Sequence, residues 1–211
     1  MIEAVRAGDV QRVAALVAGH PERAAERDAQ GVSALLHACY LRRPDIVEVL
    51  LPSLPALDLL EATAVGDTRR VGQWLENEDA VDLRSGDGFT ALHYAAFFGW
   101  PEIAALLIAA GADVAAVAAN PMAVQPLHSA AAASHRAVAE RLLAAGADPD
   151  ARQQGGYVPL HAAAQNGDDA LVELLLGHGA DRSLKTDDGR TAADIALAAG
   201  HEELAARLDG D

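Results

Sequence analysis

The sequence predicts an all-α solenoid in which short helix–turn–helix units stack one upon another. Composition is the first indication: 51% of the 211 residues are hydrophobic but only 4% are aromatic, so alanine and leucine dominate the apolar count. These residues favour helices, whereas a β-sandwich or barrel would need more valine, isoleucine, tyrosine and phenylalanine. Internal repetition with a spacing of 33 residues is the second indication, because such periods are typical of repeat architectures.

Three segments share one pattern, in which a histidine is followed by a leucine-rich stretch that ends in Gly-Ala-Asp. They are TALHYAAFFGWPEIAALLIAAGAD from Thr90, QPLHSAAAASHRAVAERLLAAGAD from Gln125 and VPLHAAAQNGDDALVELLLGHGAD from Val158. Four further segments fit the same register with another residue in the histidine position. The seven anchors are Ile2, Leu36, Leu60, His93, His128, His161 and Asp194, which are separated by 34, 24, 33, 35, 33 and 33 residues.

Each unit carries the local signals of two helices. A threonine or a substitute precedes the first helix as a capping residue, and Pro or Ala follows in the first turn, where it is tolerated. Alanine pairs such as Ala95-Ala96 allow neighbouring helices to approach closely. Gly111, Gly146 and Gly179 are expected to end the second helix, because a positive φ is cheap only for glycine.

With TALHYAA and QPLHSAA followed by leucine pairs and GAD, the sequence resembles the ankyrin repeat family over essentially its whole length. The resemblance implies a finger and two antiparallel helices in each repeat, stacked into a curved solenoid. We therefore expect one domain over 1–211, with about seven repeats including the caps. Its expected parts are N-terminal capping repeats 1–51, a truncated joint 52–57, repeats 58–185 and a C-terminal capping repeat 186–211.

Two departures from the register predict irregular places. The 24-residue step between Leu36 and Leu60 is short, and two prolines lie at 52–55, where a finger should be. One finger should therefore be missing near 52–55, which would leave a gap in the row of fingers. The 35-residue step before His128 holds two extra residues across 118–122, so this finger should be longer or irregular.

The sequence contains no HExxH, CxxC, GxSxG or GxxxxGK[ST] motif. The recurring histidines lie one repeat apart, roughly 10 Å, whereas zinc ligands lie within about 2.0–2.3 Å of the metal. Each imidazole should instead be neutral and bridge its own turn to the backbone of the next repeat. The other histidines His37, His135, His178 and His201 should be solvated, and Cys39 should be a small core residue. We expect no catalysis and no cofactor.

Charge and hydropathy restrict the partners and the compartment. A net charge of −15 disfavours nucleic acid and anionic membranes. No apolar run is long enough to span a bilayer, and the first ten residues lack the basic start and apolar stretch of a secretory signal, so we expect none. Arginine outnumbers lysine as in GC-rich bacterial genomes, and we therefore expect a bacterial cytoplasmic protein. Residues 1–51 carry −1 and residues 52–211 carry −14. This acidity either keeps an alanine-rich surface soluble or steers a basic partner to it.

Aromatic side chains are the candidate partner-binding residues. In proteins similar to this one, contacts come from the finger tips and the exposed face of the inner helix. All three phenylalanines fall in one repeat at such positions, and large aromatic side chains are frequent at the centres of interfaces. The predicted set is Phe97, Phe98, Phe89, Tyr40 and Tyr157, with Trp100 and Met122 as supporting residues.

The sequence therefore predicts a non-catalytic module that binds a partner protein through an aromatic concave groove. We expect the chain to be monomeric. Two alternatives stay open: the same patch could pair two copies of the chain as a homodimer, or Phe97 and Phe98 could fill the space left by the missing finger.

Overall fold

The computed structural model describes residues 1–77 and 81–210. In these ranges the chain forms helices and loops, without any strand beyond two isolated β-bridges, which confirms the all-α prediction. No helix in the same ranges is both long and apolar enough to cross a bilayer. The chain divides into two compact units, Met1–Ala91 and Leu92–Asp211, and each is described by itself.

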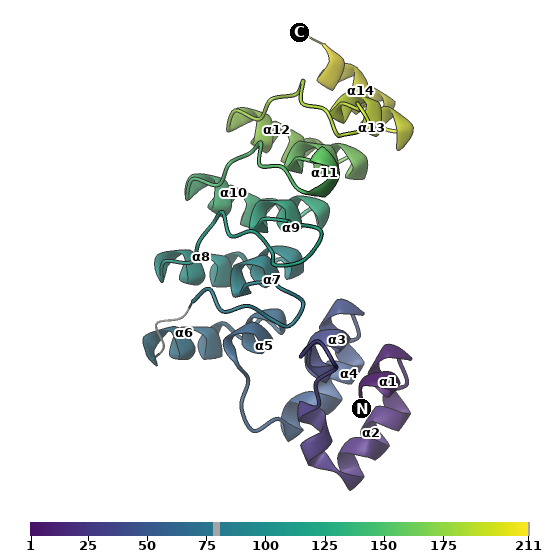
Figure 1. Cartoon of the computed structure of the whole chain (residues 1–211), viewed down its shortest axis with the longest axis vertical. Helices are drawn as coiled ribbons and strands as arrows, with labels where there is room; N and C mark the ends of the chain where they lie inside the picture. The colour runs from purple at the N-terminus through teal and green to yellow at the C-terminus, as the bar shows by residue number, and fades with distance from the viewer. Residues whose placement is uncertain (78–80, 211) are drawn as a thin grey trace. The chain divides into compact units, whose positions relative to one another are not determined.

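The first unit consists of three antiparallel helix pairs, which follow one another along the chain (Figure 1). Two of the inner helices have a capping side chain at their N-terminus. The Ser33 hydroxyl accepts a hydrogen bond of 3.2 Å from the Leu36 N–H, and the Asp58 carboxylate accepts one of 2.8 Å from the Glu61 N–H. The pairs are α1 (Ile2–Arg6) with α2 (Val10–Gly19), α3 (Ala34–Tyr40) with α4 (Pro44–Leu50), and α5 (Leu59–Ala64) with α6 (Thr68–Asn77).

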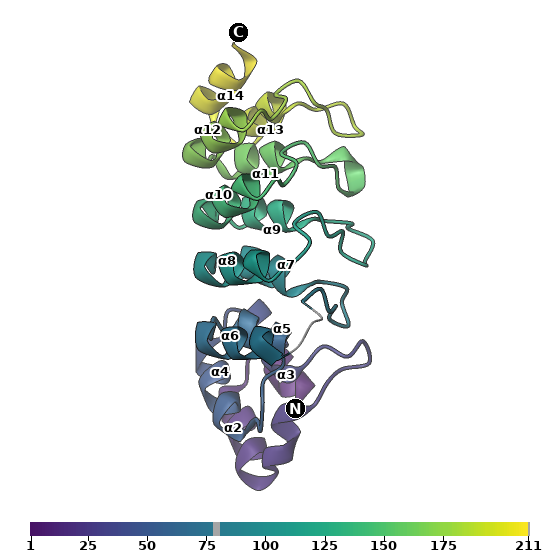
Figure 2. The ribbon, with the colours of Figure 1, turned by 90° about the vertical axis from the view of Figure 1, so that its left-hand side faces the viewer.

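The second unit stacks inner and outer helices in two rows, and its fingers extend to one side, as Figure 2 shows. Leu92, Leu127 and Leu160, one from each of three inner helices, are buried between the repeats. The inner helices are α7 (Ala91–Phe98), which begins at the boundary of the unit, α9 (Pro126–Ala132), α11 (Pro159–Asn166) and α13 (Ala192–Ala198). The outer helices are α8 (Pro101–Ala109), α10 (Arg136–Ala144), α12 (Asp169–Gly177) and α14 (Glu202–Asp209).

The predicted ends of the outer helices are confirmed. Gly111, Gly146 and Gly179 follow α8, α10 and α12 with φ angles of 89°, 91° and 92°. This left-handed conformation lets the N–H groups after the helix reach its last carbonyls, which would otherwise lack partners. The chain then turns into the next finger.

The missing finger is also confirmed, but the expected gap is closed. Between α4 and α5 the chain forms only a 3-10 turn, Leu51–Ser53, and a short extended stretch. The two flanking fingers, 27–33 and 84–90, meet directly: a Cβ on Gly86 would lie 1.6 Å from the carbonyl oxygen of Gln30. The Tyr40 hydroxyl also donates a hydrogen bond of 2.6 Å to the Asp87 carboxylate. The row of fingers in the first unit therefore continues across the truncated repeat.

The longer finger before α9 is irregular, as predicted. Ala123 has a φ of 50° at the place where Gly88, Gly156 and Gly189 of other fingers have positive φ angles. An L-residue pays about 1–2 kcal/mol for this conformation. The finger is held by the Ala118 N–H, which donates to the Val124 carbonyl at 2.8 Å.

Candidate functional site

The aromatic cluster predicted on the fourth inner helix lies partly in the core and partly on the surface. Phe97 and Phe98 are both half-buried, and their rings meet edge to face with centroids 5.1 Å apart. Phe98 also lies 6.0 Å from the ring of Tyr94, which is only 1% exposed. The cluster is thus anchored through Tyr94, and Phe97 and Phe98 remain partly exposed.

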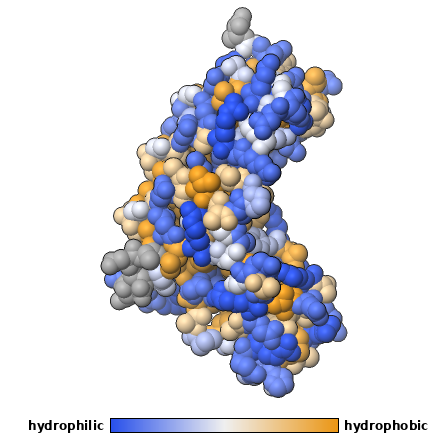
Figure 3. Space-filling view, viewed as in Figure 1, coloured by the Kyte–Doolittle hydropathy of each residue, from blue (hydrophilic) through white to orange (hydrophobic). Residues whose placement is uncertain are grey.

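Trp100 and Met122 give the second unit two further exposed apolar side chains. Trp100 precedes the first turn of α8 and is 36% exposed, and Met122 lies in the irregular finger and is 50% exposed. Hydrophobic side chains gather over the middle of this unit, around α8 and α9, whereas hydrophilic ones predominate over α13 and α14 (Figure 3).

The tyrosines of the predicted set make polar contacts within the protein. The ring of Tyr157 lies edge to face on His161, and its hydroxyl accepts from the Arg190 guanidinium of the next finger at 2.8 Å. Tyr40 holds the Asp87 finger in the first unit. Both side chains are half-buried, so each of them positions a finger and leaves part of its ring exposed.

The structure brings five of the seven predicted residues into the second unit, where Phe97 and Phe98 touch each other. Met122 and Tyr157 lie in adjacent fingers, which are joined by a hydrogen bond of 3.1 Å from the Gln154 N–H to the Met122 carbonyl. Tyr40 and Phe89 belong to the first unit, where Phe89 is half-buried beside Ser85.

The four inner helices of the second unit end in pairs of uncharged residues, which we call the inner-face strip. Asn166 is fixed in place, because its amide donates to the carbonyls of Ala131 and Ala132 and to the Ser134 hydroxyl at 3.1–3.3 Å. Gln165 is exposed beside it. Both positions follow from the repeat register. The strip consists of Phe97, Phe98, Ala132, Ala133, Gln165, Asn166, Ala198 and Ala199.

Comparison with protein families agrees with this architecture. A model described as "Ankyrin repeats (3 copies)" matches residues 59–153, and one described as "Ankyrin repeats (many copies)" matches residues 142–196. The chain belongs to the ankyrin repeat family. Residues before Leu59 lie outside both matches, and comparison with curated proteins gives no match. Ankyrin repeats are in general protein–protein interaction modules and in general not catalysts.

The histidines of the ankyrin motif bridge adjacent repeats, as predicted. The His128 Nδ1 accepts from the Gln125 N–H at 3.1 Å, and its Nε2 lies 2.8 Å from the Ala151 carbonyl of the next repeat. His161 repeats this arrangement with Val158 and Leu184. Burial holds the pKa of both imidazoles below its usual range, which favours the neutral form. His93 likewise reaches the Val124 carbonyl at 3.0 Å.

The expectation that the remaining histidines are solvated is wrong for His37. This ring is half-buried, and its Nε2 lies 2.8 Å from the Asp28 carboxylate, which also accepts from Arg6 at 2.7 Å. The contact joins the inner helix to its own finger. His135 and His201 are half-buried as well, because their rings pack over Gly99 and Gly167 of the preceding repeats; His178 is exposed as predicted. 

Cys39 is half-buried in the first unit of this ankyrin array, so it is less enclosed than a core residue. Burial and, to a smaller extent, the charge of Glu61 raise the pKa of its thiol to about 12. A thiol that stays protonated at neutral pH is a poor nucleophile. No group of three or more His, Cys, Asp or Glu side chains in the described part of the chain is arranged to hold a metal ion.

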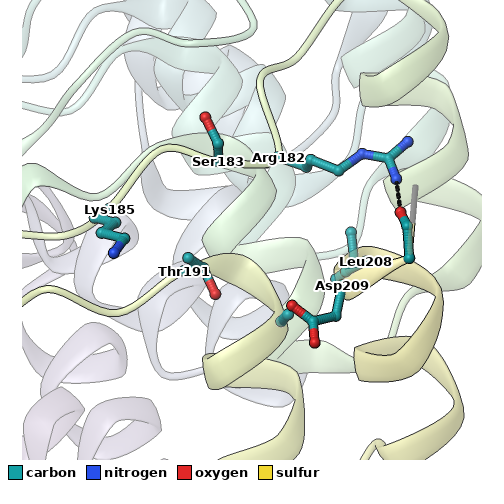
Figure 4. A pocket seen from close by; sticks show the side chains of 8 residues that line it. Arg182, Ser183, Lys185, Thr191, Leu208 and Asp209 are labelled. Carbon is teal, nitrogen blue, oxygen red and sulfur yellow. Dashed lines mark hydrogen bonds between the residues drawn. The ribbon is translucent and has the colours of Figure 1, made fainter.

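A pocket of about 530 Å³, open to solvent, lies at the last ankyrin repeat (Figure 4). Two of its polar side chains are engaged within the protein, since Arg182 donates to the Gly210 carbonyl and the Thr191 hydroxyl donates to the Asp194 carboxylate. Ala193 stands here where other repeats bury a leucine, so the pocket follows from one smaller side chain at the end of the stack. The pocket is lined by Arg182, Ser183, Lys185, Thr191, Ala193, Leu208, Asp209 and Gly210.

Proposed function

We propose that this ankyrin repeat protein binds a partner protein through the inner-face strip, with Phe97 and Phe98 as its main contacts. The observation that carries the proposal is the pair of partly exposed rings on a strip without any charged residue. Aromatic side chains supply large contact areas and are frequent among the residues that dominate interfaces. Trp100 and Met122 are further exposed apolar side chains of the same unit, and Tyr157 contributes from one of its fingers. Phe89 and Tyr40, in the first unit, are proposed as additional partner contacts.

Burial of these apolar side chains by a partner would supply part of the binding free energy. Full burial of a phenylalanine contributes about 1.5–3 kcal/mol, so covering the exposed part of the two half-buried rings contributes roughly 1 kcal/mol. Trp100 and Met122, which are 36% and 50% exposed, add about 1 kcal/mol each and raise the apolar total to about 3 kcal/mol. Because Phe97 packs on Phe98 and Phe98 on buried Tyr94, these rings lose little freedom on docking.

The proposal is tested by capture of partners with wild-type protein and with the double variant Phe97→Ser/Phe98→Ser, read by mass spectrometry. The matched control, Leu83→Ser/Leu197→Ser, removes two exposed apolar side chains outside the strip. A protein retained by wild type and by the control, but lost from the double variant, supports the proposal. Identical profiles with a folded double variant contradict it. Light scattering shows whether the chain instead pairs with itself through the same patch.

A further inference from the structure

Acidic side chains border the inner-face strip along one edge, at the turns that lead into the outer helices. Glu102, Glu202 and Glu203 are exposed in the first turns of α8 and α14, only a few residues after the strip positions of their repeats. None of these three carboxylates has an ion-pair partner in the described part of the chain. They are therefore available to a cation from outside.

The same edge carries few compensating charges. In the first turn of α12, Asp168 caps the helix by accepting from the Leu171 N–H at 3.1 Å, and Asp169 is paired with Arg207. Arg136, at the start of α10, is the remaining basic residue of these turns. The edge is thus acidic at both ends of the strip, while the strip itself is neutral.

We propose that the partner presents an amphipathic helical segment with one apolar face and one face of lysine and arginine. This inference rests on the proposed function, since it assigns the occupant of the same strip. The apolar face covers Phe97 and Phe98, uncharged polar side chains meet Gln165 and Asn166, and the basic face lies along the edge with Glu102, Glu202 and Glu203. An acidic segment would be repelled at this edge, and the strip offers no basic group to a phosphate backbone.

The size of the segment follows from the stack. Three steps between the neighbouring inner helices α7, α9, α11 and α13, at about 8–10 Å each, give a strip of roughly 25–30 Å. A helix of this length contains about 16–20 residues at 1.5 Å per residue. A partner segment of that length can touch the aromatic end and the acidic residues of α14 at once.

The test is a selection of random displayed peptides of about 18 residues on the full-length chain. We expect enriched peptides with apolar residues at helical spacing and several lysines or arginines. Their binding should be lost with Phe97→Ser/Phe98→Ser, weaken with rising salt, and fall roughly five-fold with Glu102→Gln/Glu202→Gln/Glu203→Gln, because exposed ion pairs contribute little individually. The charge-matched control Glu140→Gln/Glu173→Gln/Asp209→Asn, on the outer helices, should change binding less than about two-fold.

The outcomes separate this inference from the proposed function. Peptides that require both phenylalanines but lack basic residues, and that bind the neutralised variant as well as wild type, overturn the basic segment and leave the strip as a binding surface. Peptides that bind the double phenylalanine variant as tightly as wild type overturn the proposed function itself. A selection that enriches no peptide overturns the helical segment.

Discussion

Gly86→Ala tests how the first unit bridges its missing finger. Gly86 needs no unusual backbone conformation, but the added Cβ would lie 1.6 Å from the carbonyl oxygen and 2.6 Å from the carbonyl carbon of Gln30. Both are backbone atoms, which cannot rotate away as a flexible side chain could. The two fingers, 27–33 and 84–90, must therefore separate by on the order of 1.5–2 Å to reach an ordinary van der Waals distance.

The separation should be costly for two reasons. Forcing an extra carbon into a packed contact costs about 1–3 kcal/mol. The movement also stretches the 2.6 Å hydrogen bond from Tyr40 to Asp87, and loss of a partly buried bond to a charged group costs roughly 1–2 kcal/mol. We expect Gly86→Ala to lower the free energy of unfolding of the first unit by about 2–4 kcal/mol.

The assay is urea unfolding followed by circular dichroism, together with hydrogen exchange in the two fingers. Gly72→Ala is the matched control, because Gly72 lies within α6 and a Cβ there has no neighbouring atom within 4 Å. It should stabilise the unit by about 0.5–1 kcal/mol through helix propensity. Wild-type stability and exchange in Gly86→Ala would refute the direct contact between the fingers.

Four further predictions concern single sites. Ala123→Gly should raise the unfolding free energy by about 1 kcal/mol, because it relieves a φ of 50°; a lower urea midpoint would contradict the strain. His128 and His161 have folded-state pKa values below their usual 6.5, so the unfolded chain binds more protons and the urea midpoint should fall as pH drops below about 6.5. His128→Gln should weaken the dependence of the urea midpoint on pH. An equal pH dependence in the variant and in wild type would show that His128 does not contribute to it. Cys39, with a thiol pKa of about 12, should react with a disulfide reagent at pH 8 far more slowly in the native chain than in urea, so equal rates would refute its protection. Thr63→Val should be neutral or stabilising, because the buried Thr63 hydroxyl has no hydrogen-bond partner; a loss above about 1 kcal/mol in the unfolding free energy would show that the hydroxyl contributes.

Much of the fold follows from the sequence because each ankyrin repeat is specified locally. The anchor spacing identifies the helix pairs, the glycines after α8, α10 and α12 mark their ends, and a proline-rich stretch replaces the missing finger. The bridging role of His128 and His161 is also predictable. A histidine recurs at the same place in each of these repeats, and its two ring nitrogens can bond its own turn and the backbone of the next repeat at once.

Contacts between segments distant in the sequence are not predictable in the same way. Tyr40 and Asp87 are 47 residues apart, and they meet only because the finger between them is absent. The pairing of His37 with Asp28 depends on how one finger folds back on its helix. The partial burial of Phe97 and Phe98 depends on side-chain rotamers, which the repeat register leaves open.

The interface itself can be tested by placing a photo-crosslinking benzoylphenylalanine at position 97 in the full-length chain and irradiating cells of its source. The matched control carries the same group in place of Leu106, an exposed residue of outer helix α8. We predict a covalent adduct with one partner protein from position 97 and none with that protein from position 106. Adducts with the same protein from both positions, or from position 106 alone, would contradict a partner-binding inner-face strip, and an adduct of two copies of the chain would identify self-association instead.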